Sequence, residues 1–357
     1  MRKICFFSGD ITRSGGTERV SLIIANELAK RQEYQVIFLS LAEQKEAPFY
    51  EMGQNIKRFA LGKRWLSPGP EYLPLIPKLR SFMKKEKIDV IIDIDIVLDV
   101  LSVPATMGLK SKVISWEHSN LQYELGIGYR RMILKFFTRR TDHIVVLTPG
   151  DAKNFQDMMK RKERITAIYN PIMMNATLPE PKRERALITV GRLIPEKGTE
   201  LLKQVALKVL PSHPDWKWYL CGDGPERTGL EQFSEEQGLS EQLIICGLVP
   251  KVEEYLMRAK LFVLTSLSEG LPMCLLEART CGVPCISFDI PTGPADIIQD
   301  GLNGYLIKPF DIEDMAGKIS QLMEDEKKLD EMGKRALQDL EPFYLEKVIK
   351  EWERLID

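Results

Sequence analysis

Short apolar runs alternate along the whole chain with longer segments in which apolar residues recur every three or four positions. Short runs are typical of buried strands, and the longer period indicates amphipathic helices. In the first half we predict strands at residues 4–8, 35–40, 90–93, 113–116 and 143–147, and a helix at 18–30 with Val20, Ile23, Ile24 and Leu28 on one face. The second half repeats the pattern, with strands at 186–190, 218–221, 243–246, 261–264 and 284–288. This alternation predicts an α/β fold made of two doubly wound, Rossmann-like parallel sheets in series.

The segment between the two halves differs from both in composition. Residues 170–181 include Pro171, Pro179 and Pro181, and such proline content is typical of a linker. We therefore expect one domain over residues 1–171 and a second over 172–344. A final helix is predicted from about residue 345 to the end, with Val348 and Trp352 on one stripe.

The overall composition, with 44% hydrophobic and 28% charged residues, is ordinary for a soluble protein. The 357 residues suffice for two domains that each bury a core. No apolar run reaches the length that crosses a bilayer, and no signal peptide is visible after Met1. The six cysteines form no Cys-x-x-Cys pair and there are only three histidines. We therefore expect reduced cysteines, no zinc site and a cytoplasmic location.

Charge is unevenly distributed, although the net charge is only −1. Residues 1–170 carry 28 Lys+Arg and 19 Asp+Glu, a net charge of +9, whereas the remaining residues carry 22 and 32, a net charge of −10. A basic first half indicates an anionic partner, such as a membrane surface or a phosphorylated acceptor. Nucleic acid is disfavoured, because the acidic second half would repel a long polyanion.

Two cations and two carboxylates in the second half form the most informative pattern. Arg192 and Lys197 stand in a glycine-bounded loop after the strand at 186–190, and Glu269 and Glu277 follow about seventy residues later. Paired cations suit a diphosphate and stabilise the charge on a departing phosphate. Carboxylates accept hydrogen bonds from sugar hydroxyls. With Pro272 expected as the first helical residue, we expect the four side chains to converge on one nucleotide-sugar site.

A glycine pair, Gly15 and Gly16, precedes the first predicted helix. Adjacent glycines allow a ligand to approach the backbone, and a helix N-terminus offers N–H groups to anions. The alternative is a plain turn with Thr17 as the N-cap. No Gly-Lys-Ser/Thr follows, and no complete dinucleotide fingerprint is present, so neither a P-loop nor nicotinamide chemistry is supported.

Asp93 and Asp95 end a strand in an Asp-x-Asp pattern that could hold a divalent metal ion. Without further ligands the pattern is weak, and the alternating acids are better explained by a buried strand that emerges into solvent.

His118 follows the strand at 113–116, at the carboxyl edge where ligands bind in open α/β sheets. It could hydrogen-bond a sugar hydroxyl or position an acceptor. The alternative is a histidine with no role in function.

Residues 129–140 alternate cations with apolar side chains, as in a helix that lies on a membrane surface. The cations are Arg130, Arg131, Lys135, Arg139 and Arg140. The alternative is a helix packed on the core with a solvated basic face.

Taken together, these motifs resemble the retaining glycosyltransferases of the GT-B fold, family 4, over nearly the whole length. The resemblance includes the glycine pair, the loop from Gly191 to Gly198, the Glu-x7-Glu segment, and two further glycine-rich segments at 221–225 and 293–304. The segments at 117–120 and 269–272 are similar to members that build lipid-linked oligosaccharides and surface polysaccharides. The resemblance implies two Rossmann-like domains that face each other across a cleft, a final helix that crosses back to the first domain, and no metal requirement.

The resemblance also implies roles for individual residues. Arg192 and Lys197 would bind the donor diphosphate, Glu277 the ribose hydroxyls, and Glu269 the transferred sugar. Gly15 and Gly16 would close over the phosphates, and His118 would lie near the reacting centre. The base would rest near Gly247, Leu248 and Val249, and backbone N–H groups of the segment from Gly270 to Met273, which includes Leu271 and Pro272, would face the sugar or phosphate. Many relatives have Phe-Gly where Leu271 and Pro272 stand.

The expected enzyme is therefore a retaining hexosyltransferase with no cofactor. It would move a hexose or N-acetylhexosamine from a nucleotide-diphosphate sugar, with UDP favoured by family habit, to a hydroxyl of a glycan acceptor, such as a polyprenyl-diphosphate-linked one. We expect a cytoplasmic protein attached peripherally to the inner face of the cell membrane. Two alternatives remain: a nucleotide-sugar epimerase of the same architecture, and a non-catalytic module that binds a sugar nucleotide or a lipid headgroup.

Overall fold

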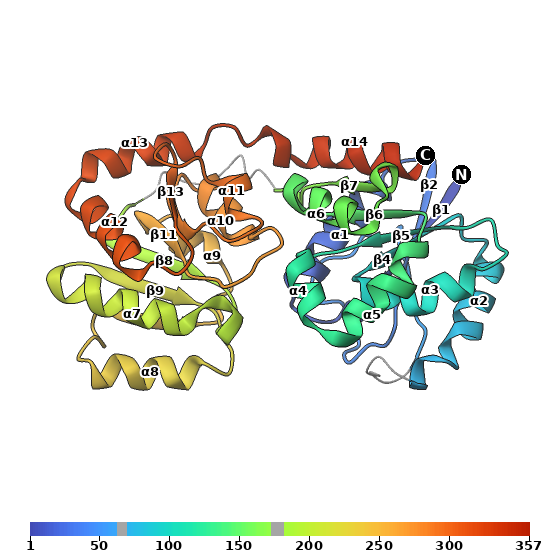
Figure 1. The fold of residues 1–357 in the computed structure, drawn as a ribbon, viewed down its shortest axis with the longest axis horizontal. Coiled ribbons are helices and arrows are strands. Elements are labelled where there is room, and N and C mark those ends of the chain that lie inside the picture. The colour runs from blue at the N-terminus through green and yellow to red at the C-terminus, as the bar shows by residue number, and fades with distance from the viewer. Residues whose placement is uncertain (63–69, 173–181) are drawn as a thin grey trace. The chain divides into compact units, whose positions relative to one another are not determined.

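The computed structural model describes residues 1–62, 70–172 and 182–357. The chain divides into two compact units, one of Met1–Pro171 with Phe343–Asp357 and one of Ile172–Pro342 (Figure 1). The predicted linker at 170–181 lies mostly outside the described residues. We call the two parts unit 1 and unit 2.

Unit 1 is built on a seven-stranded parallel sheet with the order β3-β2-β1-β4-β5-β6-β7. Its strands are β1 Arg2–Ser8, β2 Tyr34–Ser40, β3 Lys57–Ala60, β4 Val90–Ile94, β5 Lys112–Trp116, β6 His143–Val146 and β7 Ile165–Ala167. Its helices are α1 Gly16–Leu28, α2 Leu75–Glu86, α3 Asp99–Thr106, α4 Leu121–Gly126, α5 Gly128–Phe136, α6 Pro149–Met159 and α14 Leu345–Ile356. The five predicted strands are all present, and β3 and β7 were not predicted.

Unit 2 has a six-stranded parallel sheet with the order β10-β9-β8-β11-β12-β13. Its strands are β8 Ala186–Val190, β9 Lys217–Cys221, β10 Leu243–Gly247, β11 Leu261–Leu264, β12 Cys285–Phe288 and β13 Gly304–Ile307. Its helices are α7 Thr199–Val209, α8 Arg227–Glu236, α9 Val252–Leu256, α10 Met273–Thr280, α11 Pro294–Ile297, α12 Ile312–Glu324 and α13 Glu326–Ala336. The two doubly wound sheets confirm the predicted fold class.

Helices cover both faces of the unit 1 sheet, and the strand sequences reflect this. Cys5 and Phe7 of β1 pack with α2 and α3, while the alternate residues Ile4 and Phe6 are equally buried on the opposite face. A strand buried on both faces reads as a continuous apolar run. This is why β1 and its neighbours were visible in the sequence.

The last helix, α14, belongs to unit 1 and packs beside α1 (Figure 1). Trp352 stacks edge-on against Trp116 at the end of β5, with ring centroids 4.7 Å apart. Arg31 donates a 2.8 Å hydrogen bond to Glu353. The predicted return of the final helix to the first domain is thereby confirmed.

Helix α1 differs slightly from its prediction. It spans Gly16–Leu28 rather than 18–30, and Gly15 is its N-cap, so Thr17 lies inside the helix. Ile23 is only partly buried, and Leu22 and Ala25 join the buried face instead. The predicted period was correct, but its phase was shifted.

Candidate functional site

The loops that follow β8, β9 and β10 are joined at the carboxyl edge of the unit 2 sheet by backbone hydrogen bonds. The N–H of Gly191 donates to the carbonyl of Cys221 (3.0 Å), and the N–H of Gly222 donates to that of Gly247 (2.8 Å). A Cβ on Gly222 would stand 1.7 Å from the carbonyl oxygen of Gly191. The missing side chain therefore allows these loops to approach closely and to form a continuous rim around the strand ends.

Gly198 fixes the position of Lys197 against the end of β11. Its φ is +67°, in the left-handed region, and a Cβ would lie 1.9 Å from the carbonyl oxygen of Thr265. Thr265 Oγ1 in turn donates to the carbonyl of Lys197 (3.1 Å), and the N–H of Leu267 donates to that of Glu196 (2.9 Å). Only glycine satisfies both the dihedral angle and the contact.

Replacing Gly198 with alanine should therefore displace the Lys197 loop. We expect a free energy of unfolding lower by about 1–3 kcal/mol, because the left-handed backbone and the clash both oppose the native geometry. The matched control is Gly229→Ala in α8, where nothing lies within 4 Å of the added Cβ. That control should be neutral or stabilising by about 0.5–1 kcal/mol. Guanidinium denaturation of both variants checks the result, and equal midpoints would contradict the role given to Gly198.

Lys197 and Glu269 form a direct ion pair within this rim. Lys197 Nζ donates to Glu269 Oε1 at 2.6 Å, and Ser266 Oγ donates to the same oxygen at 2.7 Å. The Glu269 side chain is 9% exposed. Burial lowers the pKa of Lys197, but the attraction of Glu269 outweighs it and leaves that pKa raised. Lys197 is thus a cation at neutral pH, and Glu269 engages one of its three N–H donors.

Arg192 and Glu277 lie near the Lys197–Glu269 ion pair. Arg192 is exposed and close enough to Lys197 to oppose its positive charge. Within the described part of the chain we find no ion pair or hydrogen bond from the Arg192 guanidinium. Glu277 is half-buried on α10, and Lys197, Glu269 and Glu277 are all close enough to Cys274 on the same helix to act electrostatically on its thiol. The structure therefore gathers all four predicted side chains in unit 2.

The segment from Gly270 to Met273 leads into α10. The helix begins at Met273, so Pro272 is its N-cap and not, as predicted, its first residue. Thr292 Oγ1 donates to the carbonyl of Glu269 at 2.6 Å. Leu271 is buried, so its side chain anchors the loop in the unit rather than pointing at a ligand.

Sequence reasoning missed Ser266, Thr265 and Thr292, which orient the Lys197–Glu269 pair. Thr265 and Ser266 directly follow β11, at the same carboxyl edge that drew attention to the other loops. Their position at a strand end was the signal that could have identified them.

The predicted base-binding segment lies at the end of β10. Gly247 has a φ of +69° and turns the chain beside the Arg227 guanidinium, which would lie 2.9 Å from an added Cβ. Leu248 is 76% exposed. An exposed leucine at this edge offers an apolar surface on which a flat ring can lie.

In unit 1, Gly15 and Gly16 form the start of α1 with no side-chain cap. The Glu18 carboxylate occupies the space where a Gly15 side chain would stand, 2.1 Å from the position of its Cβ. Asp10 builds the preceding turn by accepting hydrogen bonds from the N–H and the hydroxyl of Thr12. The role of the glycine pair in phosphate binding stays a prediction.

His118 follows β5, and its ring lies 4.4 Å from that of Trp116. Its Nε2 is buried without a hydrogen-bond partner among the described residues. Burial lowers the pKa of His118 to about 3. The imidazole is therefore neutral at pH 7, so it can offer or accept a hydrogen bond but carries no charge; contact with substrate stays a prediction.

The two acids of the Asp-x-Asp pattern have different surroundings in the structure. Asp93 is fully buried, hydrogen-bonded to Ser102 and beside Asp99, and burial raises its pKa to about 7. Asp95 has a φ of +94° and accepts a 2.8 Å hydrogen bond from Arg130. Each acid thus has a structural partner of its own. Among residues 1–62, 70–172 and 182–357, no cluster of three metal-ligating side chains is found.

The prediction that Arg130 belongs to a basic membrane face is wrong, because the Arg130 side chain points into unit 1. Its guanidinium is paired with Glu124 (2.6 Å), Asp95 (2.8 Å) and Glu117 (3.6 Å). Burial raises the pKa of Glu117, and it raises that of Glu124 to about 7. Arg130 is thus the centre of a buried charge cluster and is not available to a partner.

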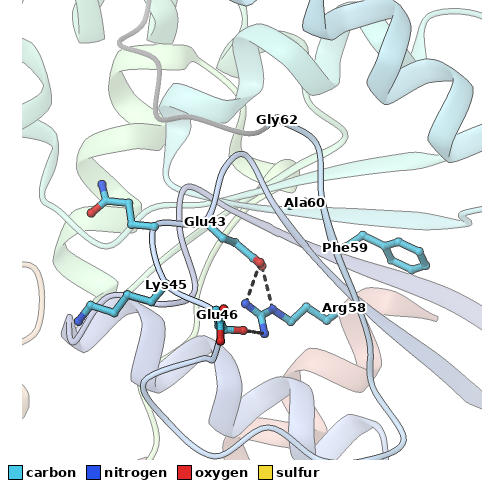
Figure 2. Close-up of a pocket in the computed structure, with 8 residues that line it drawn as sticks. Glu43, Lys45, Glu46, Arg58, Phe59, Ala60 and Gly62 are labelled. Carbon is cyan, nitrogen blue, oxygen red and sulfur yellow. Dashed lines mark hydrogen bonds and ion pairs between the residues drawn. The ribbon is translucent and has the colours of Figure 1, made fainter.

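A cavity of about 550 Å³ lies beside β3 in unit 1 (Figure 2). Arg58 spans it and pairs with Glu43 at 2.7 Å. Its lining contains none of the predicted site residues, and Gly62 at its rim borders a segment outside the described residues. We assign it no part in the site.

Two parallel-sheet units with charged loops at their strand ends are the architecture of GT-B glycosyltransferases, and the comparisons agree. Residues 14–175 match Glycosyltransferase Family 4, and residues 174–339 match Glycosyl transferases group 1. A Haemophilus influenzae protein described as an uncharacterized glycosyltransferase is 30% identical over 361 residues, covering the whole of both chains. The chain belongs to this family of glycosyltransferases.

Two further similarities bear on the fold and on candidate substrates. A Campylobacter jejuni α-1,4-N-acetyl-D-galactosaminyltransferase, named for an undecaprenyl-diphosphate-linked glycan, is 27% identical over 100% of this chain and 98% of its own. The structure of HepE from Anabaena, in complex with UDP and glucose, is similar with a TM-score of 0.82 at 19% identity, covering 99% of this chain and 98% of that one. At that identity the structural match supports the fold alone.

Proposed function

We propose that the protein is a retaining glycosyltransferase that moves a hexose or N-acetylhexosamine from a UDP-sugar to a hydroxyl of a lipid-linked glycan in surface polysaccharide assembly. The observation that carries the proposal is the grouping of Arg192, Lys197, Glu269 and Glu277 at one sheet edge of unit 2. Cations beside carboxylates match a diphosphate joined to two polyols. The named substrates of the Campylobacter relative support a lipid-linked acceptor, and UDP is the nucleotide that the family resemblance favours.

In this proposal Lys197 and Arg192 stabilise the diphosphate as the bond from the sugar to phosphate breaks. Glu269 holds Lys197 in place through one N–H, which leaves two for phosphate oxygens. Arg192 adds a planar fork that suits the same group. Glu277 accepts hydrogen bonds from the ribose, and Leu248 lies against the base.

Of the two carboxylates in the proposed site, Glu269 is held by Lys197 and Ser266, and Glu277 is assigned to the ribose, so the proposal gives neither of them the role of attacking the sugar. We therefore propose a transfer on one face of the sugar, in which a donor phosphate oxygen takes the proton of the acceptor hydroxyl. Neutral His118 would hydrogen-bond a sugar hydroxyl. The proposal requires no metal ion. We place the reaction in the cytoplasm, where the six free cysteines stay reduced.

UDP release from a panel of UDP-sugars, with and without a polyprenyl-diphosphate-linked glycan, tests the proposal. We expect release that depends on the acceptor, and a product whose new linkage keeps the anomeric configuration of the donor. An epimerase would convert the donor without any acceptor, and a binding module would take up a UDP-sugar without releasing UDP. An inverted linkage would reject the retaining mechanism.

A further inference from the structure

Helix α5 presents an apolar stripe to solvent. Tyr129, Met132 and Phe136 are 47%, 53% and 48% exposed. At about 100° per residue these three side chains fall within an arc of about 60° on the helix. Leu134 is buried on the opposite side of the helix, and Ile133 is buried next to the stripe, so these two residues hold the helix to unit 1. We call Tyr129, Met132 and Phe136 the apolar stripe.

Cations border the apolar stripe. Arg131 and Lys135 are exposed on the adjoining face of α5, and Arg139 and Arg140 are exposed just beyond its end. Lys135 Nζ lies 5.4 Å from the centre of the Phe136 ring. Between residues 121 and 140 the single carboxylate is Glu124, which is buried and paired with Arg130. The exposed surface of this segment is therefore cationic and apolar, with no negative charge.

The positive charge continues beyond α5. Arg161, after α6, donates a hydrogen bond to the carbonyl of Arg139, and Arg164 and Arg139 are both close enough to Arg161 to oppose its positive charge. Asp142 offsets part of this charge, but its Oδ2 already accepts a 2.8 Å hydrogen bond from the N–H of Val113. The basic rim thus extends over two helices of unit 1.

We infer that the apolar stripe and its basic rim dock unit 1 on the surface of an anionic lipid bilayer. Aromatic side chains and methionine can enter the headgroup region while Arg and Lys meet lipid phosphates. The absence of exposed carboxylates between residues 121 and 140 gives this face the charge complementarity that such a surface needs. None of the helices in the described ranges has the length and apolar character to cross a bilayer, so the attachment is interfacial. The inference extends the proposed function, since a lipid-linked acceptor is held at such a surface.

Flotation with vesicles tests the inference on the whole protein, with no donor or acceptor present. The vesicles are phosphatidylcholine alone, or phosphatidylcholine with about a quarter phosphatidylglycerol. We expect binding to the anionic vesicles that weakens as salt is raised, and little binding to the neutral ones. The double variant Met132→Ser/Phe136→Ser should bind at least tenfold more weakly than the native chain. Its matched control is Met107→Ser/Phe49→Ser, the same residue types at other exposed positions of unit 1.

Charge reversal provides a second pair of variants. Arg131→Glu/Lys135→Glu should weaken binding by about 25-fold or more, given roughly fivefold for each cation near such a surface. Lys84→Glu/Lys85→Glu on α2 reverses two exposed cations of the same unit and should bind as the native chain does.

Equal binding by the stripe variant and its control would overturn the inference, as would equal binding to neutral and anionic vesicles. UDP release with a water-soluble glycan is measured in parallel. A stripe variant that binds vesicles normally but fails in this assay would identify the surface as an acceptor or protein contact instead. Because the vesicle assay involves no transfer, its outcome is independent of the proposed function.

Discussion

Replacing Lys197 with methionine should reduce kcat/KM for sugar transfer by about 10³-fold while the chain stays folded. The ammonium group is the partly buried cation of the proposed diphosphate site, and a preorganised charge of this kind stabilises the leaving group more in the transition state than in the ground state. Steady-state UDP release, with circular dichroism to verify folding, measures the effect. Lys208→Met on α7, which removes an exposed lysine paired with Glu313, should leave the activity unchanged.

The Lys197–Glu269 pair requires one further control. Methionine at 197 leaves a nearly buried carboxylate without its cation, and this lowers stability independently of catalysis. The double variant Lys197→Met/Glu269→Gln removes that charge, so its unfolding midpoint should recover while its activity does not. Near-normal turnover in either variant would refute the role given to Lys197.

Replacing Arg130 with methionine should lower the free energy of unfolding by about 3–5 kcal/mol, because it leaves Glu117, Glu124 and Asp95 without their shared cation. Arg131→Met, one residue away and exposed, should change it by no more than about 0.5 kcal/mol. Guanidinium unfolding at pH 8 measures both. Equal midpoints for the two variants would show that the buried cluster contributes nothing to stability.

The difference in stability between these two variants should depend on pH. Burial raises the folded-state pKa of Glu117, and it raises that of Glu124 to about 7, so protonated forms are favoured in the folded chain. Stability linked to such groups is present below the unfolded pKa of about 4.5 and is lost as the pH rises through the folded value. Loss of the Arg130 cation raises the folded-state pKa of Glu117 and of Glu124 further. The deficit of the Arg130 variant should therefore be smaller at pH 5 than at pH 8.

The central strands and the edge strand β10 could be predicted from the sequence, whereas the edge strands β3, β7 and β13 could not. β1, β4, β8 and β11 are largely buried, and each contains a short apolar run. β3, β7 and β13 are short strands at sheet edges, and β3 contains Lys57 and Arg58. Polar side chains on short edge strands limit unwanted pairing, and they also remove the pattern that reveals a strand.

Part of the candidate site could likewise be predicted from the sequence, and part could not. The loops of Lys197 and Glu269 follow strands whose ends could be located in the sequence, so their convergence could be predicted. The direct bond between the two side chains could not, because it depends on how closely Gly198 lets two loops approach. Arg130 was misassigned for a related reason. Of its three carboxylate partners, Asp95 follows β4, whereas Glu117 and Glu124 follow β5, and no local pattern shows that they meet.

The packing of α14 on unit 1 has a consequence for biosynthesis. Trp352 covers Trp116, so a segment that is translated after unit 2 completes unit 1, most of which is translated before it. While unit 2 is being translated, the indole of Trp116 in unit 1 is not yet covered by Trp352. Unit 1 can then be bound by chaperones, which recognise exposed apolar surface. A product terminated before Leu345 would keep that uncovered surface, by which proteases could recognise an unfinished chain.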